Sequence, residues 1–229
     1  MYVCYNTLMA RKITNIKNVI KKYNTIIFDF DGTLINSEPA HNEGHRVMLE
    51  TIMGKPIPNF KDFVEMYIGK RDSVIFEEFK EIFHLDCDTS LMFDLKRRAV
   101  LDILLNDDKC MLKYIDDIFS AKDNRRYYIL SNNHKSFIEE ILDKKGYCQY
   151  IDQIFCMEDM NTNKEYFLEH IDDYISDVDK SSLIICEDSV PFIKYLVDNG
   201  YDTLAVESEF NLGRVNNAKY IIKDGFEGE

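Results

Sequence analysis

The chain has 229 residues, of which 45% are hydrophobic and 30% are charged, and it contains 14 Tyr and 15 Phe. This composition excludes a disordered chain and suits one sizeable domain, or a core domain that carries a smaller insert. The formal net charge of −13 argues against nucleic acid and membranes as partners, because both attract clustered Lys and Arg.

The N-terminal segment, residues 1–22, is expected to be a helical extension that packs on the domain. Its apolar side chains recur at helical spacing, at Ile13, Ile16, Val19 and Ile20. The segment lacks the features of a signal peptide, and no window of the chain has the roughly 18 apolar residues that a bilayer span needs. The six cysteines form no CxxC pair, as is typical of reduced thiols. We therefore expect a cytoplasmic protein, either a monomer or a weak homodimer.

The first strand is expected in the run TIIFDF, residues 25–30, whose β-branched and aromatic residues suit a buried parallel strand. From about residue 37 to about residue 100 the pattern changes to helical periodicity with charged faces, and no convincing strand occurs. This change predicts a helical cap at 37–99, inserted into a core made of 1–36 and 100–229.

Helix and strand signals alternate through the rest of the chain. The expected strands lie in RYYILSNN, YIDQIFCME, SSLIICEDS, YDTLAVES and YIIKD, with helical runs between them. Such alternation is typical of a parallel sheet with helices on both faces. The fold class is therefore α/β, with a Rossmann-like parallel sheet core and an inserted all-helical cap domain.

Polar residues gather directly after the expected strands. In open α/β sheets, ligands bind outside the carboxyl ends of the strands, so these residues are expected to meet at one edge. Mg²⁺ prefers carboxylate, carbonyl and phosphate oxygens as ligands, which makes the group the outline of a magnesium and phosphate site. Its members are Asp29, Asp31, Ser131, Asn132, Glu187 and Asp188 after three strands, and Lys164 at the start of a helix after a fourth.

Each of these segments also has a plainer interpretation. Asp-Gly after a strand is a common turn, and Ser131 alone suits a strand end or a helix cap. Lys164 is compatible with an ordinary solvated lysine, and Glu187 and Asp188 with acids of a surface loop. Agreement among four separate segments favours the site over these alternatives.

The four segments DFDGTL, ILSNN, NKEYF and IICEDS, in this order, resemble the motifs of the haloacid dehalogenase superfamily. More narrowly, the chain resembles the phosphatase branch related to β-phosphoglucomutase, which carries a helical cap after the first motif. Two departures stand out: the family usually has Lys-Pro where this chain has Lys164-Glu165, and usually has Gly after the acidic motif where this chain has Val190.

The resemblance implies a role for each matching residue. Asp29 is implied as the nucleophile, which forms an aspartyl-phosphate, and Asp31 as the acid and base that serves both steps. Phosphate contacts are implied for Ser131, Asn132 and Lys164, and Gly32 permits a tight turn whose amides face the phosphate. The implied cofactor is Mg²⁺, held by Asp29, Asp31, Glu187 and Asp188.

The expected cap is the part that covers the site and contacts substrate in this family. His41 matches a histidine that couples cap closure to acid–base alignment in the related mutase, although a lone histidine is more often structural or solvated. Four cap cations are candidates for contacts to a phosphorylated substrate, and solvated helix charges are the alternative for each: Lys70, Arg71, Lys96 and Arg97.

The expected function is therefore a Mg²⁺-dependent phosphatase that acts on a small phosphorylated metabolite. One alternative is a sugar phosphomutase of the β-phosphoglucomutase type, which shares every core residue and differs in whether phosphate passes to sugar or to water. A further alternative is a non-catalytic binding protein on the same scaffold.

Overall fold

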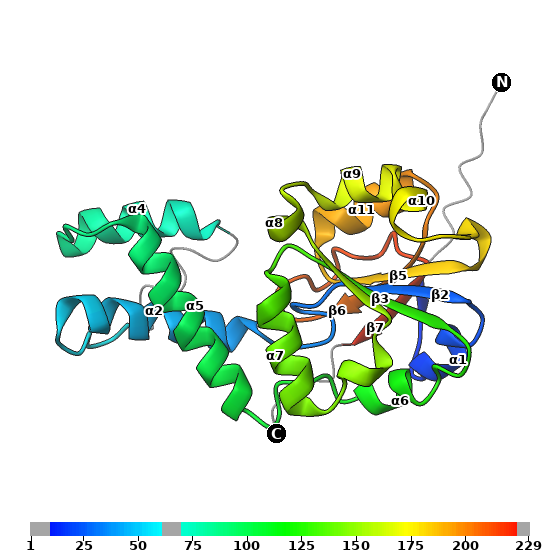
Figure 1. Cartoon of the computed structure of the whole chain (residues 1–229), viewed down its shortest axis with the longest axis horizontal. Helices are drawn as coiled ribbons and strands as arrows, with labels where there is room; N and C mark the ends of the chain where they lie inside the picture. The colour runs from blue at the N-terminus through cyan, green and yellow to red at the C-terminus, as the bar shows by residue number, and fades with distance from the viewer. Residues whose placement is uncertain (1–9, 61–69, 224–229) are drawn as a thin grey trace. The chain divides into compact units, whose positions relative to one another are not determined.

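The structure is a computed structural model of the chain, and it describes residues 10–60 and 70–223. The chain divides into two compact units (Figure 1). One unit consists of Met1–Asn36 together with Lys109–Glu229, and the other of Ser37–Asp108. The first is called the core unit below, and the second the helical unit.

The core unit is built on a seven-stranded sheet in which every neighbouring pair is parallel. The α/β fold class expected from the sequence is confirmed. The strand order is β1-β7-β6-β5-β2-β3-β4. The strands are β1 (Arg11–Lys12), β2 (Thr25–Phe28), β3 (Arg126–Ser131), β4 (Gln153–Cys156), β5 (Leu183–Glu187), β6 (Asp202–Glu207) and β7 (Tyr220–Lys223).

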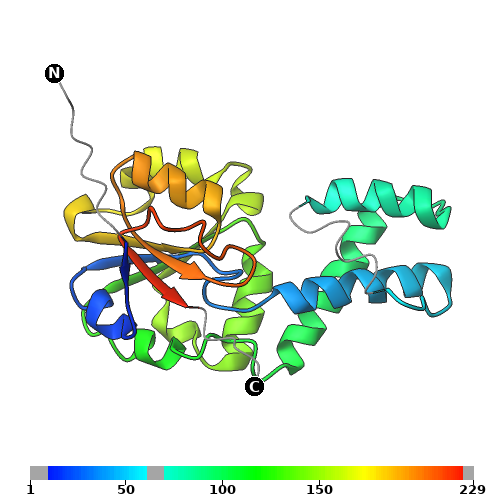
Figure 2. The ribbon, with the colours of Figure 1, turned by 180° about the vertical axis from the view of Figure 1, so that it is seen from behind.

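Helices cover both faces of the sheet, as Figures 1 and 2 show. Helices α9 and α11 lie on one face, and α1, α6 and α7 on the other. Successive residues of β2 are buried toward opposite faces, and Ile27 packs with Phe167 and Leu196 of the α9 and α11 layer. The helices are α1 (Ile16–Ile20), α6 (Ile115–Phe119), α7 (Lys135–Lys145), α8 (Met157–Met160), α9 (Lys164–Glu169), α10 (Ile171–Tyr174) and α11 (Val190–Asp198), with 3₁₀ turns at Cys148–Tyr150 and Lys180–Ser182.

Strand β2 lies in the interior of the sheet, between β5 and β3. Phe28, its last residue, is in register with Ile129 of β3 and Cys186 of β5. The chain leaves these strands at one level and at the same edge, because all three are parallel. Their carboxyl ends therefore bring together the residues that follow them, at the kind of position where open α/β sheets bind ligands.

The N-terminal segment differs in part from the expected helical extension. Ile16, Val19 and Ile20 are buried on α1, as their spacing predicts. Arg11 and Lys12 instead form β1, which extends the sheet beside β7. A two-residue strand of exposed cations carries no alternating apolar pattern, so periodicity could not reveal it. Residues 1–9 lie outside the described part of the chain.

The helical unit contains α2 (Glu38–Met53), α4 (Asp72–Phe83) and α5 (Thr89–Asn106) in its described residues. Gly44 allows α2 to approach α5 closely, because a Cβ at this position would lie 2.5 Å from Val100 Cγ2. Helix α5 continues to Asn106, beyond the expected cap limit at residue 99.

The two chain segments that lead to and from the helical unit are paired within the core unit. Asn36 N donates a hydrogen bond to Cys110 O at 2.7 Å, and Leu112 N donates to Leu34 O at 3.1 Å. Ile35 and Met111 form an antiparallel bridge between them. This pairing fixes the end of the loop that carries Asp31.

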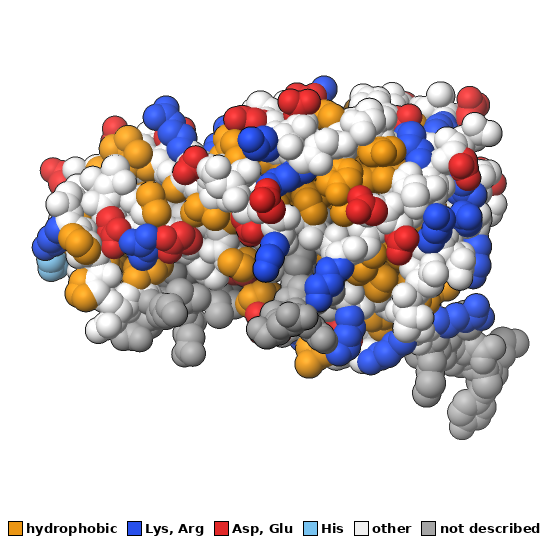
Figure 3. Space-filling view, turned by 90° about the horizontal axis from the view of Figure 1, so that it is seen from below, with side chains coloured by type: hydrophobic (Ala, Val, Ile, Leu, Met, Phe, Trp, Pro, Cys, Tyr) orange, Lys and Arg blue, Asp and Glu red, His pale blue; other side chains and the backbone are white. Residues whose placement is uncertain are grey.

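Acidic and basic side chains are interspersed on the face drawn in Figure 3. Within residues 10–60 and 70–223, no helix combines the length and the apolar character needed to cross a bilayer.

Candidate active site

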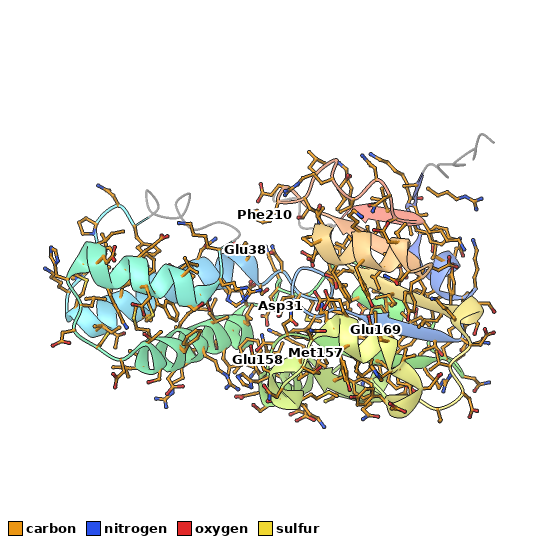
Figure 4. All side chains as sticks on the ribbon, turned by 90° about the horizontal axis from the view of Figure 1, so that it is seen from above. Asp31, Glu38, Met157, Glu158, Glu169 and Phe210 are labelled. Atoms are coloured by element: carbon orange, nitrogen blue, oxygen red, sulfur yellow. The ribbon has the colours of Figure 1, made fainter. Side chains whose placement is uncertain are left out.

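The residues expected at the site follow three neighbouring strands of the core unit. Asp29 comes directly after β2, Ser131 ends β3 and Glu187 ends β5. Figure 4 labels Asp31, Met157 and Phe210, which follow β2, β4 and β6 at the same edge of the sheet. Parallel pairing thus places residues that are far apart in the sequence beside one another.

Lys164 joins two of these strand ends. Its Nζ lies 2.9 Å from Asp29 Oδ1 and 2.8 Å from Glu187 Oε2. The side chains of all three residues are almost fully buried, and the Lys164 ammonium also lies 5.1 Å from the centre of the Phe192 ring. The alternative of a solvated lysine is therefore wrong for Lys164.

The start of α9 fixes where the Lys164 side chain begins. Asn163 caps this helix, because its Oδ1 accepts a hydrogen bond from Tyr166 N at 2.8 Å. Lys164 is the first residue of α9. In the family that the sequence resembles, proline usually follows this lysine. Glu165 in this chain occupies that next position without removing Lys164 from the buried cluster.

Carboxylates outnumber the cation that they share. Asp29, Glu187 and Asp188 each offer an oxygen, and these oxygens lie within 4.8 Å of one another. Burial, and then the nearby Glu187, raise the pKa of Asp29 well above its usual value, and the same two causes raise the pKa of Asp188 to about 8. Burial alone would lower the pKa of Lys164, but Asp29 and Glu187 raise it above its ordinary value.

This crowding of acids fits a divalent cation. Buried carboxylates are stable when they are paired with cations or coordinate a metal, and Lys164 offsets the charge only in part. Hard oxygen ligands from two adjacent strand ends suit Mg²⁺. Asp29, Glu187 and Asp188 therefore fit the metal that the sequence predicts.

Glu187 also fixes the turn that carries Asp188. Its Oε1 accepts hydrogen bonds from Asp188 N at 3.2 Å and from Ser189 N at 2.9 Å, while its Oε2 contacts Lys164. Both carboxylate oxygens of Glu187 are thus engaged within the protein. Asp188 is the half-buried member of the acidic group.

Asp31 lies beside the loop that follows β3. Asn133 Nδ2 donates a hydrogen bond to Asp31 Oδ2 at 3.3 Å, and Asn133 N donates to Ser131 Oγ at 3.0 Å. Asn133 thereby links the expected acid–base residue to the expected phosphate-binding serine. The neighbouring Asn132 is exposed, and the phosphate contact expected of it stays a prediction. The sequence did not single out Asn133, because the direction of each side chain depends on backbone geometry that the sequence does not reveal.

Gly32 has a steric role that was not expected. Its φ of +72° favours glycine, and a Cβ at this position would lie 2.3 Å from Asp188 Oδ2. Its N–H donates to Ile35 O at 2.8 Å, so this amide is engaged within the turn. Glycine at this position therefore lets the Asp188 carboxylate approach the turn after β2.

The remaining candidates lie in the helical unit. His41 is on α2, and its proposed role stays a prediction. Lys96 is buried and donates to both carboxylate oxygens of Asp72 at 2.6 Å, which differs from the solvated alternative. Lys70 pairs with Glu78 at 2.6 Å on the surface. Arg71 and Arg97 stay as predictions of substrate contacts.

A comparison with protein families matches residues 26–202 to haloacid dehalogenase-like hydrolases. This match spans well over half of the chain and includes every core residue of the acidic cluster. The chain therefore belongs to the haloacid dehalogenase-like hydrolase family, and the resemblance noted in the sequence is confirmed. A comparison with curated proteins gave no match.

Several solved structures share the fold. YfnB from Bacillus subtilis, solved bound to magnesium, is 21% identical with a TM-score of 0.72, and the match covers 89% of this chain and 95% of that one. CbbY from Rhodobacter sphaeroides, in complex with phosphate, is 14% identical with a TM-score of 0.67 over 90% of this chain and 96% of that one. A family IA hydrolase from Entamoeba histolytica is 18% identical with a TM-score of 0.68, and the match covers 90% of this chain and 95% of that one.

Proposed function

We propose that this hydrolase is a Mg²⁺-dependent phosphatase that cleaves a small phosphomonoester through an aspartyl-phosphate on Asp29. One observation carries the proposal: Lys164 contacts both Asp29 and Glu187 in a buried cluster at the ends of β2 and β5, beside Asp188. A carboxylate nucleophile must approach an anionic phosphate, so a site for this chemistry needs cations that offset the charge. Lys164 and a Mg²⁺ ion held by the acidic cluster would together meet that need.

In the first step, an Asp29 carboxylate oxygen attacks phosphorus, and the bond from phosphorus to the leaving oxygen breaks. Lys164 holds Asp29 Oδ1 through a 2.9 Å contact, which orients the other carboxylate oxygen for attack. Ser131 Oγ, at the end of β3, is the group that we propose binds a phosphate oxygen. The loop that contains Ser131 is held by the hydrogen bond from Asn133 N.

Asp31 moves the protons in both steps. It begins protonated and gives its proton to the leaving oxygen, and the alcohol departs. It then takes a proton from a water molecule, whose oxygen attacks phosphorus as the bond from phosphorus to Asp29 breaks. Inorganic phosphate leaves, and Asp29 returns as a carboxylate. Asn133 Nδ2, 3.3 Å from Asp31 Oδ2, orients Asp31 for this work.

Asp29, Asp188 and Glu187, with the backbone carbonyl of Asp31, are the groups that would hold Mg²⁺. The ion supplies charge neutralisation for the phosphoryl group in this chemistry. The crowding of three carboxylates around Lys164 supports this assignment.

The substrate is proposed to be a small phosphorylated metabolite. CbbY, which shares the fold, has been solved with phosphate and, as a mutant, with xylulose-1,5-bisphosphate. These ligands support a phosphorylated small molecule for this chain as well. His41 and the cations of the helical unit stay proposed substrate contacts, and a cytoplasmic location is part of the same proposal.

A phosphate-release screen tests the function. Purified protein with Mg²⁺ is assayed against sugar phosphates, nucleotides and other phosphorylated metabolites, and we expect inorganic phosphate from at least one class. Products are also analysed, because interconverted sugar phosphates without net phosphate would indicate the mutase instead. Absence of turnover across the whole panel, together with unchanged partner binding in Asp29→Asn, would favour a binding protein.

A further inference from the structure

We infer that Asn211 is a positioning residue that holds Asp188 in place for the divalent cation. Asn211 lies in the loop after β6, far in sequence from the motifs that define the site, and no sequence signal selected it. The inference rests on the proposed function, since it concerns a group that Asp188 is proposed to bind. The loop from Ser208 to Arg214 is called the brace loop below.

The Asn211 side chain is buried and uses both of its N–H donors and its oxygen in hydrogen bonds. Its Nδ2 donates to Asp188 O at 2.8 Å and to Val206 O at 2.8 Å. Its Oδ1 accepts from Ser208 N at 2.8 Å. One amide group therefore ties the brace loop, the end of β6 and the backbone of Asp188 together.

Other contacts make the brace loop a firm support. Glu207, buried at the end of β6, accepts a hydrogen bond from Gly213 N at 3.2 Å through its Oε1. Asn211 also donates its own N–H to Ser208 O at 3.3 Å, and its carbonyl accepts from Arg214 N at 2.9 Å. The loop is thus anchored at both ends and at its centre.

These contacts fix Asp188 from both sides of its backbone. Its N–H donates to Glu187 Oε1 at 3.2 Å, and its carbonyl accepts from Asn211. Its carboxylate lies against Gly32, where a Cβ would lie 2.3 Å from Oδ2. With the backbone and the carboxylate both confined, Asp188 is held before any cation arrives.

Loss of this support is expected to weaken metal binding rather than the chemical step. Residues that orient metal ligands typically change metal affinity by about 10-fold to about 100-fold when they are replaced. Asn211 contacts neither Asp29 nor Asp31 in any hydrogen bond described above. If Asn211 were merely structural, its replacement would lower stability and leave the Mg²⁺ affinity of the folded protein unchanged.

The test is calorimetric titration of Mg²⁺ alone into the full chain, for the wild type and for Asn211→Ala. We expect the Mg²⁺ Kd to rise by about 10-fold to about 100-fold in Asn211→Ala. The Mg²⁺ Kd of Asn211→Ser, which keeps a short polar group, should lie between those of the wild type and Asn211→Ala. This variant serves as the test if the alanine variant does not fold. Asn216→Ala is the matched control, because Asn216 Nδ2 bonds only Gly213 O at 2.7 Å among the hydrogen bonds described for its side chain.

A second measurement separates this inference from the proposed function. With p-nitrophenyl phosphate as probe, saturating Mg²⁺ should bring kcat of Asn211→Ala close to the wild-type value. Wild-type Mg²⁺ affinity in folded Asn211→Ala and Asn211→Ser would overturn the inference while the phosphatase assignment stands. A wild type that binds Mg²⁺ but releases no phosphate would overturn the function, with the affinity difference still supporting Asn211. A wild type that does not bind Mg²⁺ would overturn both.

Discussion

In the helical unit, Lys96 donates to both oxygens of Asp72, and His45 Nε2 lies 3.2 Å from the same carboxylate. In the core unit, Lys164 is shared among carboxylates that outnumber it. Both clusters bury a lysine, but the acid of the first is paired within the protein, whereas the second has more carboxyl groups than cations. The contrast separates a cluster that is paired within the helical unit from one that we propose a divalent cation completes.

The pKa values follow the same division. Burial alone would raise the pKa of Asp72, but the hydrogen bond from His45 and the charge of Lys96 hold it well below its usual value. The pKa of Asp188 is instead raised to about 8, first by burial and then by Glu187. Carboxylates with raised pKa values are typical of functional sites, whereas a lowered pKa indicates that the charged form is already satisfied.

The largest expected effect is on turnover when Asp29 is replaced. Asp29→Asn removes the proposed nucleophile and should lower kcat by about 10³-fold or more. Its free energy of unfolding without metal should stay within about 1 kcal/mol of the wild type or rise, because a crowded carboxylate is removed. Phosphate release and denaturant unfolding measure the two quantities. Asp198→Asn, on the surface, is the control, and near-wild-type turnover in Asp29→Asn would refute the mechanism.

Lys164→Gln should have the next largest effect, lowering kcat by about 10²-fold to about 10³-fold, because it removes the cation that orients Asp29. The matched control is Lys194→Gln, which removes the lysine of an exposed pair with Asp198. That control should keep wild-type kcat. Equal losses of kcat in the two lysine variants would show that the buried lysine matters no more for turnover than the exposed one.

Asp72→Asn should act on stability instead. The substitution leaves Lys96 buried without its carboxylate, and it should lower the free energy of unfolding by about 2–3 kcal/mol. This loss is at the low end for buried ion pairs, because the Asp72 side chain is partly exposed. Glu78→Gln, on the same helix, breaks the surface pair with Lys70 and should cost at most about 1 kcal/mol. Denaturant unfolding compares them. A cost for Asp72→Asn no greater than that for Glu78→Gln would remove the distinction between the clusters.

The smallest effect is the acid sensitivity that His45 gives to the helical unit. Burial lowers the pKa of His45 below its usual 6.5. As the pH falls below about 6.5, the unfolded chain takes up a proton that the folded chain resists, so stability falls. The charges that face His45 are those of Asp72, Lys96 and His41. His45→Gln should flatten the fall in unfolding free energy between about pH 6.5 and pH 5, and an unchanged pH profile would contradict this account.

Much of the core could be predicted because parallel sheets impose simple rules. Apolar runs such as LIIC mark buried strands, and polar residues after them must lie at one edge. The positions of Asp29 and Glu187 at neighbouring strand ends follow from these rules, and the family match supports the order of the motifs. The roles given to these residues stay predictions until turnover is measured.

Other features depend on contacts that a sequence pattern does not encode. Lys96 looks like any cation in the run LKRR, and its burial depends on Asp72, which lies on a different helix. Asn133 and Asn211 act through the direction of single side chains in loops, where no periodicity exists. Strand β1 has two exposed cations and no apolar pattern, and it joins the sheet by backbone pairing with β7.

The central claim is that Asp29 carries the phosphoryl group, and chemical trapping tests it most directly. Wild-type protein turning over p-nitrophenyl phosphate with Mg²⁺ is quenched and reduced with borohydride, which converts an aspartyl-phosphate to homoserine, and the peptides are identified by mass spectrometry. We expect homoserine at residue 29, and none when Mg²⁺ is chelated or when Asp29→Asn is used. Phosphate release with no homoserine, or with homoserine at another aspartate, would contradict the account.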